Sequence, residues 1–382
     1  MTSEVTKRPI RVLHVIETLG TGGMENGVVN LVNGHDPDTV SAEVLCTRSL
    51  GDFAERIPSK KLHFSPSAGS GITSAVRTVS RLCRKRRFDV VHSHSWATLM
   101  PGFFGAKLSR TPKYVHGEHG TLYLDKFRRR ILQRTIFNRA DRCLAVSKSL
   151  MAEITAKLRI PADNFSVIIN GVDLSKFGPD PRRKGLLLQA IGAEIDSIII
   201  GSVGRLVSVK DYPTLLRAFA ALCDSTEKNC RLVLVGDGPQ RERLQKLARE
   251  IEVSEQVNFL GESDVVEEIL PAFDIFVLPS IHEGMSNTLL EAAACGVVTI
   301  ASDIAPNHEI VIEGETGLVF EVGNTNSLHD RLKYLVSNED QRQNMSRTSL
   351  AYAREKWSID NMIRNYEKLY CSLVDAPASG HA

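Results

Sequence analysis

The chain has 382 residues, more than one ordinary hydrophobic core holds, so we expect two domains of roughly 150–200 residues each. Its apolar fraction of 42% and charged fraction of 24% are those of a soluble globular protein. The net charge is only +2, but Lys and Arg outnumber Asp and Glu 27 to 16 in residues 1–180, whereas the other residues carry a balance of −9. This asymmetry predicts that the first half meets an anionic partner, with an unevenly charged, solvated surface as the alternative.

Cysteine usage and hydropathy exclude several classes of protein. The seven cysteines include no CxxC pair and are odd in number, which argues against a zinc site or a disulfide framework and favours a reducing cytosol. The opening residues, MTSEVTKRP, lack the apolar stretch of a secretory signal. No run of about 18 apolar residues occurs, so no membrane-spanning segment is expected.

Short apolar runs alternate with amphipathic stretches along the first half. Several runs are almost purely apolar, which is typical of parallel strands buried on both faces. The expected strands are Ile10–Ile16, Glu43–Cys46, Asp89–His92, Lys113–His116, Arg142–Ser147 and Ser166–Ile169. Gly71–Arg87 and Phe127–Arg139 are expected to be helices between them.

The same alternation begins again in the second half. The expected strands are Ile198–Val203, Arg231–Val235, Val257–Leu260, Ile275–Leu278, Val297–Ala301 and Gly317–Phe320. The helices between them include Tyr212–Cys223, Gln240–Ile251 and Asn287–Cys295. Alternating strands and helices predict an α/β protein with two facing, doubly wound, Rossmann-like domains and an interdomain cleft.

We place the domains at residues 1–180 and 181–358. The segment Asp173–Gly192 is rich in turn formers and lacks a periodic apolar face, so it is expected to be the linker and a hinge. The last helical stretch, 359–374, follows both sheets and is expected to pack across the domain boundary. Ligands of such sheets bind beyond the carboxyl ends of the strands, and these loops are therefore the candidate sites.

The first strand is followed by a loop that contains Gly20, Gly22 and Gly23 and opens a helix. Glycines at this position let backbone amides approach a phosphate at the start of a helix. The GxGxxG fingerprint of dinucleotide binding is not met, and a glycine-rich turn is also ordinary structural punctuation. Both interpretations of this loop stay open.

Two histidine-containing segments end strands of the first half. In HSH, at residues 92–94, no third ligand lies in register, which favours core or loop histidines over a metal pair. In VHGEHG, at residues 115–120, a histidine beside glycine at a strand end is typical of a site residue, with an incidental polar turn as the alternative. The helical HExxH spacing of a metal site is absent there.

Two features of the second half favour a diphosphate ligand. Arg205 ends a strand and Lys210 follows five residues later, and two such cations suit a diphosphate. In EGMSNTLLE, at residues 283–291, Ser286 or Asn287 can cap a helix whose start attracts an anion. The two glutamates bracket this helix start and can grip hydroxyl groups on either side of a diphosphate, although acidic residues near helix starts are also ordinary stabilisers.

Taken in order, these segments resemble glycosyltransferase family 4 along essentially the whole chain. The matching pieces are GTGGMENGVVNL, VVHSHS, VHGEHG, AVSKSL, IINGVDLSKF, GSVGRLVSVKDYPTLLRAF, LVGDGP, VNFLG and PSIHEGMSNTLLEAAACG. The last is the most specific, because two glutamates are separated by seven residues within an EG-hydrophobic-[PS]-N frame. The VHGEHG and GGMENG forms look most like a branch linked to bacterial exopolysaccharide biosynthesis.

The resemblance implies the GT-B fold and a retaining, hexosyltransferase-type enzyme that moves a sugar from a nucleotide-sugar donor to a glycan or lipid-linked acceptor. Carried over by motif, the catalytic residues would be His116, Arg205, Lys210 and Glu283. The donor-binding residues would be Gly22, Gly23, His119, Leu260, Gly261, Ser286, Asn287, Thr288 and Glu291.

Within this set the resemblance assigns separate roles. Arg205 and Lys210 would neutralise the diphosphate, with backbone amides of residues 22–23 and 286–288. Glu283 would bind the sugar hydroxyls and Glu291 the ribose, while residues 259–261 would hold the base. His116 matches the histidine of the family that contacts the sugar, and His119 competes for that role. The sequence departs from the family at Asp211, where many members have glycine, and we expect no loss of activity from this.

The implied reaction is front-face attack on an oxocarbenium-like centre, with the leaving phosphate taking the acceptor's proton. It needs no metal or cofactor, and no DxD-like motif is evident. An epimerase of the same fold and a non-catalytic nucleotide-sugar-binding module are the alternatives. The former lacks an apparent acid–base carboxylate set, and the intact Arg205, Lys210, Glu283 and Glu291 argue against the latter.

Two basic runs, Arg81–Arg87 and Lys126–Arg134, contain apolar residues among the charges, as interfacial helices do. They predict docking on an anionic membrane surface, and hence a cytoplasmic protein that is peripheral on the inner face of the plasma membrane. A solvated basic face is the alternative. Nucleic acid is not expected as a partner, because no nucleic-acid module accompanies the charge.

Overall fold

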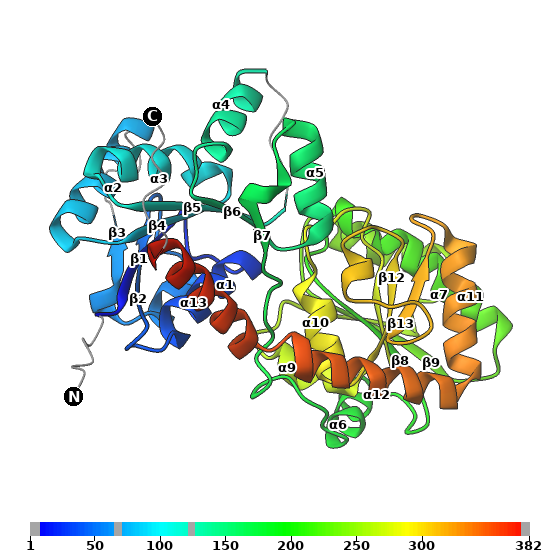
Figure 1. The fold of residues 1–382 in the computed structure, drawn as a ribbon. Helices are drawn as coiled ribbons and strands as arrows, with labels where there is room; N and C mark the ends of the chain where they lie inside the picture. The colour runs from blue at the N-terminus through cyan, green and yellow to red at the C-terminus, as the bar shows by residue number, and fades with distance from the viewer. Residues whose placement is uncertain (1–7, 65–70, 121–126, 376–382) are drawn as a thin grey trace. The chain divides into compact units, whose positions relative to one another are not determined.

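The computed structural model describes residues 8–64, 71–120 and 127–375, which form two compact units (Figure 1). The first unit comprises the described residues of Met1–Asn170 and Ile359–Ala382, and the second comprises Gly171–Ser358. Each unit has its own hydrophobic core around a parallel sheet. The α/β class and the two Rossmann-like domains expected from the sequence are therefore confirmed.

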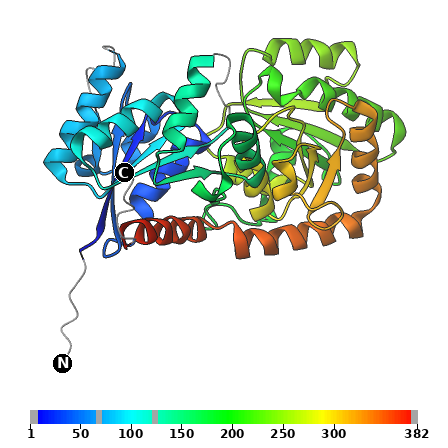
Figure 2. The ribbon, with the colours of Figure 1, turned by 45° about the horizontal axis from the view of Figure 1, so that its top comes forward.

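The first unit contains a seven-stranded parallel sheet in the order β3-β2-β1-β4-β5-β6-β7. Its strands are β1 (Ile10–Ile16), β2 (Val40–Cys46), β3 (Leu62–Phe64), β4 (Val90–His94), β5 (Lys113–Glu118), β6 (Arg142–Ala145) and β7 (Phe165–Val167). Its helices are α1 (Gly23–Gly34), α2 (Ile72–Arg86), α3 (Ser95–Ser109), α4 (Phe127–Phe137), α5 (Lys148–Leu158) and α13 (Ile359–Asp375). Helices α1 and α13 cover one face of this sheet, and α2 and α3 cover the other (Figures 1 and 2).

The second unit contains a six-stranded parallel sheet in the order β10-β9-β8-β11-β12-β13. Its strands are β8 (Ile198–Val203), β9 (Cys230–Val235), β10 (Val257–Gly261), β11 (Ile275–Leu278), β12 (Val298–Ser302) and β13 (Gly317–Phe320). Its helices are α6 (Arg182–Ala190), α7 (Tyr212–Ser225), α8 (Arg241–Glu250), α9 (Val266–Ile269), α10 (Asn287–Ala294), α11 (Thr325–Ser337) and α12 (Glu339–Lys356). Strands β8 and β11 are buried throughout, as their continuous apolar sequences predict.

Each sheet has one switch point, where the strand order reverses. In the first unit it lies between β1 and β4, and in the second unit between β8 and β11. The loops that follow the two central strands diverge there, and ligands of open α/β sheets bind outside the carboxyl ends of these strands. The strand order thus selects two places in the molecule as candidate sites.

The structure divides the chain at 170/171, ahead of the boundary predicted after residue 180. Val172 pairs with Ser358, and its amide donates to the carbonyl of Trp357 at 2.7 Å, which ties this segment to the end of the second unit. Residues 182–190, interpreted as part of a linker, form helix α6, and this interpretation was wrong. The reason is that α6 buries only Leu188 fully, so its sequence shows no periodic apolar face.

Helix α13 lies in the first unit, although it follows the second in sequence. Its buried residues join the core formed by α1, β1 and β2; they are Met362, Ile363, Tyr366, Tyr370 and Leu373. The sequence also missed β3, whose three residues are partly exposed and therefore show no apolar run. Among the described residues, no helix has the length and hydropathy required to cross a bilayer.

Candidate active site

In the second unit, backbone hydrogen bonds join the segments at the carboxyl ends of β8, β9 and β10. The Gly204 amide donates to the carbonyl of Val235 at 2.9 Å, and the Gly236 amide donates to that of Gly261 at 2.7 Å. Gly236 has a φ of 128°, and a Cβ there would overlap with the carbonyl of Gly204. Only glycine allows so close an approach, and the backbone segments that end β8, β9 and β10 therefore remain in direct contact.

An ion pair joins the two strands that flank this switch point. Lys210, which follows β8, places Nζ 2.6 Å from Oε1 of Glu283, which follows β11. The Ser280 hydroxyl donates to the same oxygen at 2.6 Å. Both charged side chains are largely buried, at 19% and 14% exposure. Oε2 of Glu283 has no such contact within the described part of the chain, and so it remains available to a ligand.

Arg205 adds a second cation at the end of β8. It directly follows Gly204, its side chain is exposed, and its guanidinium forms no ion pair with the residues that the structure describes. The loops that carry the two cations and the glutamate are joined where the Ile281 amide donates to the carbonyl of Val209 at 2.8 Å. The positive charge predicted for this strand end is thus present, with the Arg205 guanidinium exposed to solvent.

Helix α10 begins beside the ion pair. Ser286 is its N-cap, because its hydroxyl accepts from the Leu289 amide at 3.4 Å and lies 3.0 Å from the Thr288 hydroxyl. The sequence left Ser286 and Asn287 as alternative caps, and the structure selects the serine. The partial positive charge of the helix therefore begins at Asn287, close in sequence to Glu283.

Glu291 lies one turn inside α10 and is half-buried. Burial raises the pKa of its carboxyl to about 7, and the negative charge of Glu267 acts in the same direction. The carboxyl group consequently carries a proton over part of the neutral range. In that form it can donate a hydrogen bond as well as accept one.

The segment expected to hold the base lies at the edge of this sheet. Leu260 is 39% exposed at the end of β10, and Gly261 has a φ of 80°. The Arg241 guanidinium donates to the carbonyl of Phe259 at 3.3 Å and fixes this strand end. Through the contact of Gly261 with Gly236, the segment is linked to the loops that carry Arg205.

The predicted phosphate loop of the first unit is partly occupied by the protein itself. Gly22 is the N-cap of α1 and supplies no side-chain cap, as a phosphate-binding start would require. A Cβ on Gly22 would overlap with the carboxylate of Glu25, which lies folded against it. An acidic side chain therefore lies beside Gly22 in this structure.

The two candidate histidines of VHGEHG differ in their contacts. His116 is fully buried, with Nδ1 2.8 Å from the Ser93 hydroxyl and Nε2 3.1 Å from a Glu118 carboxylate oxygen. His119 is half-buried, with Nε2 3.1 Å from Nδ1 of His94. Its Nδ1 has no partner among the described residues. Of the two, only His119 has a ring nitrogen without a partner among the described residues, and this nitrogen is buried.

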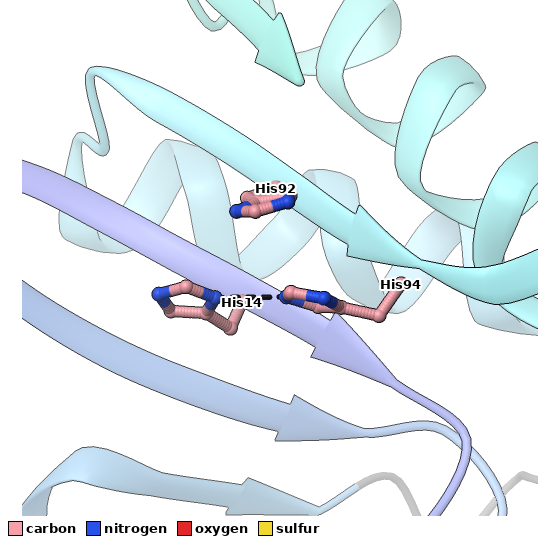
Figure 3. Close-up of side chains that lie close together, drawn as sticks. All are labelled: His14, His92 and His94. Atoms are coloured by element: carbon pink, nitrogen blue, oxygen red, sulfur yellow. Dashed lines mark hydrogen bonds between the residues drawn. The ribbon is translucent and has the colours of Figure 1, made fainter. Parts of the chain in front are cut away.

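A third histidine, His14, lies beside the two histidines of the HSH segment. The sequence pattern did not predict this neighbour. The parallel register of β1 and β4 places His14 beside His92 (Figure 3). Nδ1 of His14 lies 2.9 Å from Nε2 of His94, and the rings of His92 and His94 are 4.1 Å apart. Burial lowers the pKa of His14 to about 3 and those of the other two well below the ordinary range. Only strand order, which local sequence does not specify, could have revealed this neighbour.

Two family models match the chain, one on each unit. The model described as Glycosyltransferase Family 4 matches residues 21–176, and the model described as Glycosyl transferases group 1 matches residues 187–351. The chain is 31% identical over 308 residues to EpsF of Bacillus subtilis (strain 168), which is named as a glycosyltransferase. That alignment covers 77% of this chain and 79% of the relative.

A second relative and a solved structure agree with this. The UDP-Gal:alpha-D-GlcNAc-diphosphoundecaprenol alpha-1,3-galactosyltransferase of Escherichia coli is 30% identical over 260 residues, which cover 66% of this chain and 67% of that protein. Anabaena Alr3699/HepE in complex with UDP has a TM-score of 0.84 at 19% identity, over 95% of this chain and 100% of that one, and so shares the fold. The chain therefore belongs to glycosyltransferase family 4, and it is a glycosyltransferase of the GT-B fold.

Proposed function

We propose that this enzyme transfers a sugar, with retention of anomeric configuration, from a nucleotide-diphosphate sugar to a glycan or lipid-linked acceptor. The observation that carries the proposal is the Lys210–Glu283 ion pair beside the start of α10, at the switch point of the second unit. Cations, helix amides and a glutamate with a spare oxygen are the groups that a diphosphate bonded to a sugar requires.

In this proposal the diphosphate lies against Arg205, Lys210 and the first amides of α10. Negative charge grows on the leaving diphosphate as the glycosidic bond breaks, so fixed positive groups stabilise the transition state more than the bound donor. Backbone hydrogen bonds hold the loops that carry both cations, and the ion pair with Glu283 fixes the Lys210 side chain before the reaction. The positive charge comes from side chains and amides, so the step calls for no metal or cofactor.

Glu283 and Glu291 divide the recognition of the donor between them. Lys210 and Ser280 hold one oxygen of Glu283, and the other can accept from a sugar hydroxyl. Glu291 lies further along the helix, where its carboxyl can pair with ribose hydroxyls. Retention follows if the acceptor attacks from the face that the diphosphate leaves, with a phosphate oxygen taking the acceptor's proton. His119, through Nδ1, is the histidine we assign to the sugar.

The lipid-linked acceptor is supported by the E. coli relative, whose name specifies a diphosphoundecaprenol substrate, and by a surface of the first unit. Helices α2, α3 and α4 pack side by side, and α3 and α4 expose apolar side chains: Phe104, Leu108, Phe127 and Ile131. Exposed basic residues of α2, its C-cap and α4 accompany them: Arg81, Arg84, Lys85, Arg87, Arg128, Arg130 and Arg134. Of the run Lys126–Arg134, Lys126 lies outside the described residues.

Exposed apolar and basic side chains together are what binding to an anionic bilayer requires. We therefore propose that the enzyme works as a peripheral protein on the cytoplasmic face of the plasma membrane. The similarity to EpsF and the E. coli galactosyltransferase further supports a place in bacterial exopolysaccharide or cell-surface polysaccharide synthesis.

Product analysis tests the proposal. The purified enzyme is incubated with UDP-, GDP- and ADP-sugars, each with and without undecaprenyl-diphosphate-linked sugars in anionic vesicles. We expect one donor to yield its nucleoside diphosphate and a glycosylated lipid, in which NMR finds the donor's anomeric configuration. An epimerised donor would favour the epimerase alternative. Donor binding without any product would favour a non-catalytic module, and an inverted product would refute retention.

A further inference from the structure

Three imidazoles are buried together at the switch point of the first unit, whereas the residues proposed to bind the diphosphate belong to the second unit. His14 comes from β1, and His92 and His94 come from β4 (Figure 3). None of the three is exposed to solvent. Histidine is uncommon in the interior of a sheet, because each ring carries two polar atoms that must find partners there.

The cluster leaves some of these atoms without partners. Nε2 of His14 and Nε2 of His92 accept or donate no hydrogen bond within the described part of the protein. Exchanging the tautomers cannot satisfy them, because a bare nitrogen lacks a donor and a protonated one lacks an acceptor. The cluster is thus a set of neutral, electron-donating groups that the described residues alone do not satisfy.

The spacing of the rings fits one ion. One nitrogen from each ring can be chosen so that all three lie within 4.8 Å of one another. Nitrogens that share a tetrahedral zinc ion at about 2.0–2.1 Å lie about 3.4 Å apart, so small rotations of the rings would reach this geometry.

The surroundings also orient two of the rings as metal ligands usually are. Nδ1 of His92 lies 2.8 Å from the Tyr370 hydroxyl of α13, and Nδ1 of His94 lies 3.1 Å from Nε2 of His119. In metal sites the second ring nitrogen of a histidine is typically held by such a partner, which fixes the ring and directs the other nitrogen to the ion. His92 is thus held through Nδ1, and its Nε2 has no partner among the described residues. His94 is also held through Nδ1, and an ion would replace the contact between its Nε2 and Nδ1 of His14, which lie 2.9 Å apart.

We propose that His14, His92 and His94 bind one divalent transition-metal ion of the zinc type, which joins β1 to β4. Neutral imidazole ligands without a carboxylate suit zinc, copper and nickel rather than magnesium or calcium. Three protein ligands leave a fourth position that a water molecule can take. The site is structural, because its ligands are inaccessible to a substrate. None of its three ligands takes part in the proposed transferase chemistry, although His94 contacts His119 at 3.1 Å.

The test measures Zn²⁺ binding to the full chain. Metal content is determined on protein as purified, after chelation, and after long equilibration with Zn²⁺, and the affinity is obtained by competition with a chromophoric chelator. We expect one equivalent of Zn²⁺ and a higher unfolding temperature in its presence. Co²⁺ in place of Zn²⁺ should produce the visible absorption of a tetrahedral, nitrogen-ligated ion. An unaltered chain that binds no Zn²⁺, or that gives only octahedral Co²⁺ spectra, would overturn the proposal.

Variants locate the ion. His14→Asn and His94→Asn should each remove the bound equivalent, and Tyr370→Phe, which keeps the aromatic ring, should weaken Zn²⁺ binding about 10–100-fold. His308→Ala is the matched control, because His308 is exposed in the second unit and pairs with Asp303 at 2.6 Å. If the histidine variants fail to fold, Tyr370→Phe and the Co²⁺ spectrum still show whether the ion binds at these histidines. Binding that stays equal in Tyr370→Phe and His308→Ala would place the ion elsewhere and refute the site.

Discussion

Lys210 and Glu283 are 73 positions apart in sequence, yet Nζ of the lysine lies 2.6 Å from Oε1 of the glutamate. The pair connects the loop that follows β8 to the loop that follows β11, and it holds each of the two side chains in one orientation. Most surface ion pairs contribute little to stability. This one is largely buried, and its glutamate also accepts a hydrogen bond from the Ser280 hydroxyl. We infer that it presets the cation and the carboxylate for a ligand at the switch point.

Arg205→Ala should lower kcat more than it weakens donor binding, because the charge that Arg205 meets grows in the transition state. We expect a loss of about 2–4 kcal/mol of barrier stabilisation, or roughly 30- to 1000-fold in kcat/KM, as for other preorganised donors to a developing anion. Steady-state kinetics, with the donor that the product analysis identifies, measure this loss. Lys246→Ala, an exposed lysine of α8, is the control. A kcat equal to that of the unaltered enzyme would refute the role.

Glu283→Gln and Glu291→Gln should separate sugar from ribose recognition. Glutamine keeps the size of each side chain but removes the charge. We expect Glu283→Gln to weaken mainly the sugar-bearing donor, and the free nucleoside diphosphate less, because Oε2 faces the sugar in our proposal. Glu291→Gln should weaken both ligands. Calorimetry with each ligand decides, and equal losses for both ligands in both variants would contradict this division.

Glu291 should also make the stability of the second unit depend on pH. Its pKa is raised to about 7 in the folded state, so the unfolded chain loses this proton first as the pH rises. The free energy of unfolding should therefore fall between about pH 4.5 and 7 and level off above, by at most about 3 kcal/mol. Glu291→Gln should remove this slope and be the more stable protein at pH 8.

Tryptophan fluorescence isolates the unit in question. Trp357 is buried in the second unit, whereas Trp96 belongs to the first, so denaturation is followed in a Trp96→Phe background with and without Glu291→Gln. Identical pH profiles for the two proteins would show that the carboxyl is not held in its neutral form.

Membrane docking should require both the charged and the apolar side chains of α4. Each basic residue near an anionic surface contributes about 1 kcal/mol, so Arg128→Glu with Arg130→Glu should weaken vesicle binding more than tenfold. Phe127→Ser, which removes a ring that is 74% exposed, should weaken it further. Sedimentation with anionic and neutral vesicles measures this at low and high salt, since salt screens the attraction.

Arg243→Glu is the control for the docking experiment, because Arg243 is an exposed arginine of α8 in the second unit. It reverses one arginine charge, as each of the two α4 substitutions does, and should leave binding almost unaltered. Equal recovery of the unaltered enzyme with neutral and anionic vesicles at low salt would refute docking and favour a soluble acceptor.

Local sequence determined most of the elements and much of the proposed donor site. Strands such as Ile198–Val203 are buried on both faces, so their continuous apolar sequence is enough to recognise them. The capped start of α10 is likewise local, because Ser286 and the amide it accepts from are three residues apart. The resemblance to family 4 rested on motifs of this kind, and the family models confirm it.

Tertiary structure alone decided which distant residues meet. The pairing of Lys210 with Glu283, and of His14 with His94, follows from strand order and register, which periodicity within a strand does not report. The same holds for His116, one of whose ring nitrogens is taken by Ser93 of the neighbouring strand. Helix α6 was missed for a related reason, since one buried leucine leaves too weak a pattern to detect. Periodicity records how deeply each segment is buried, whereas a site depends on which segments are neighbours.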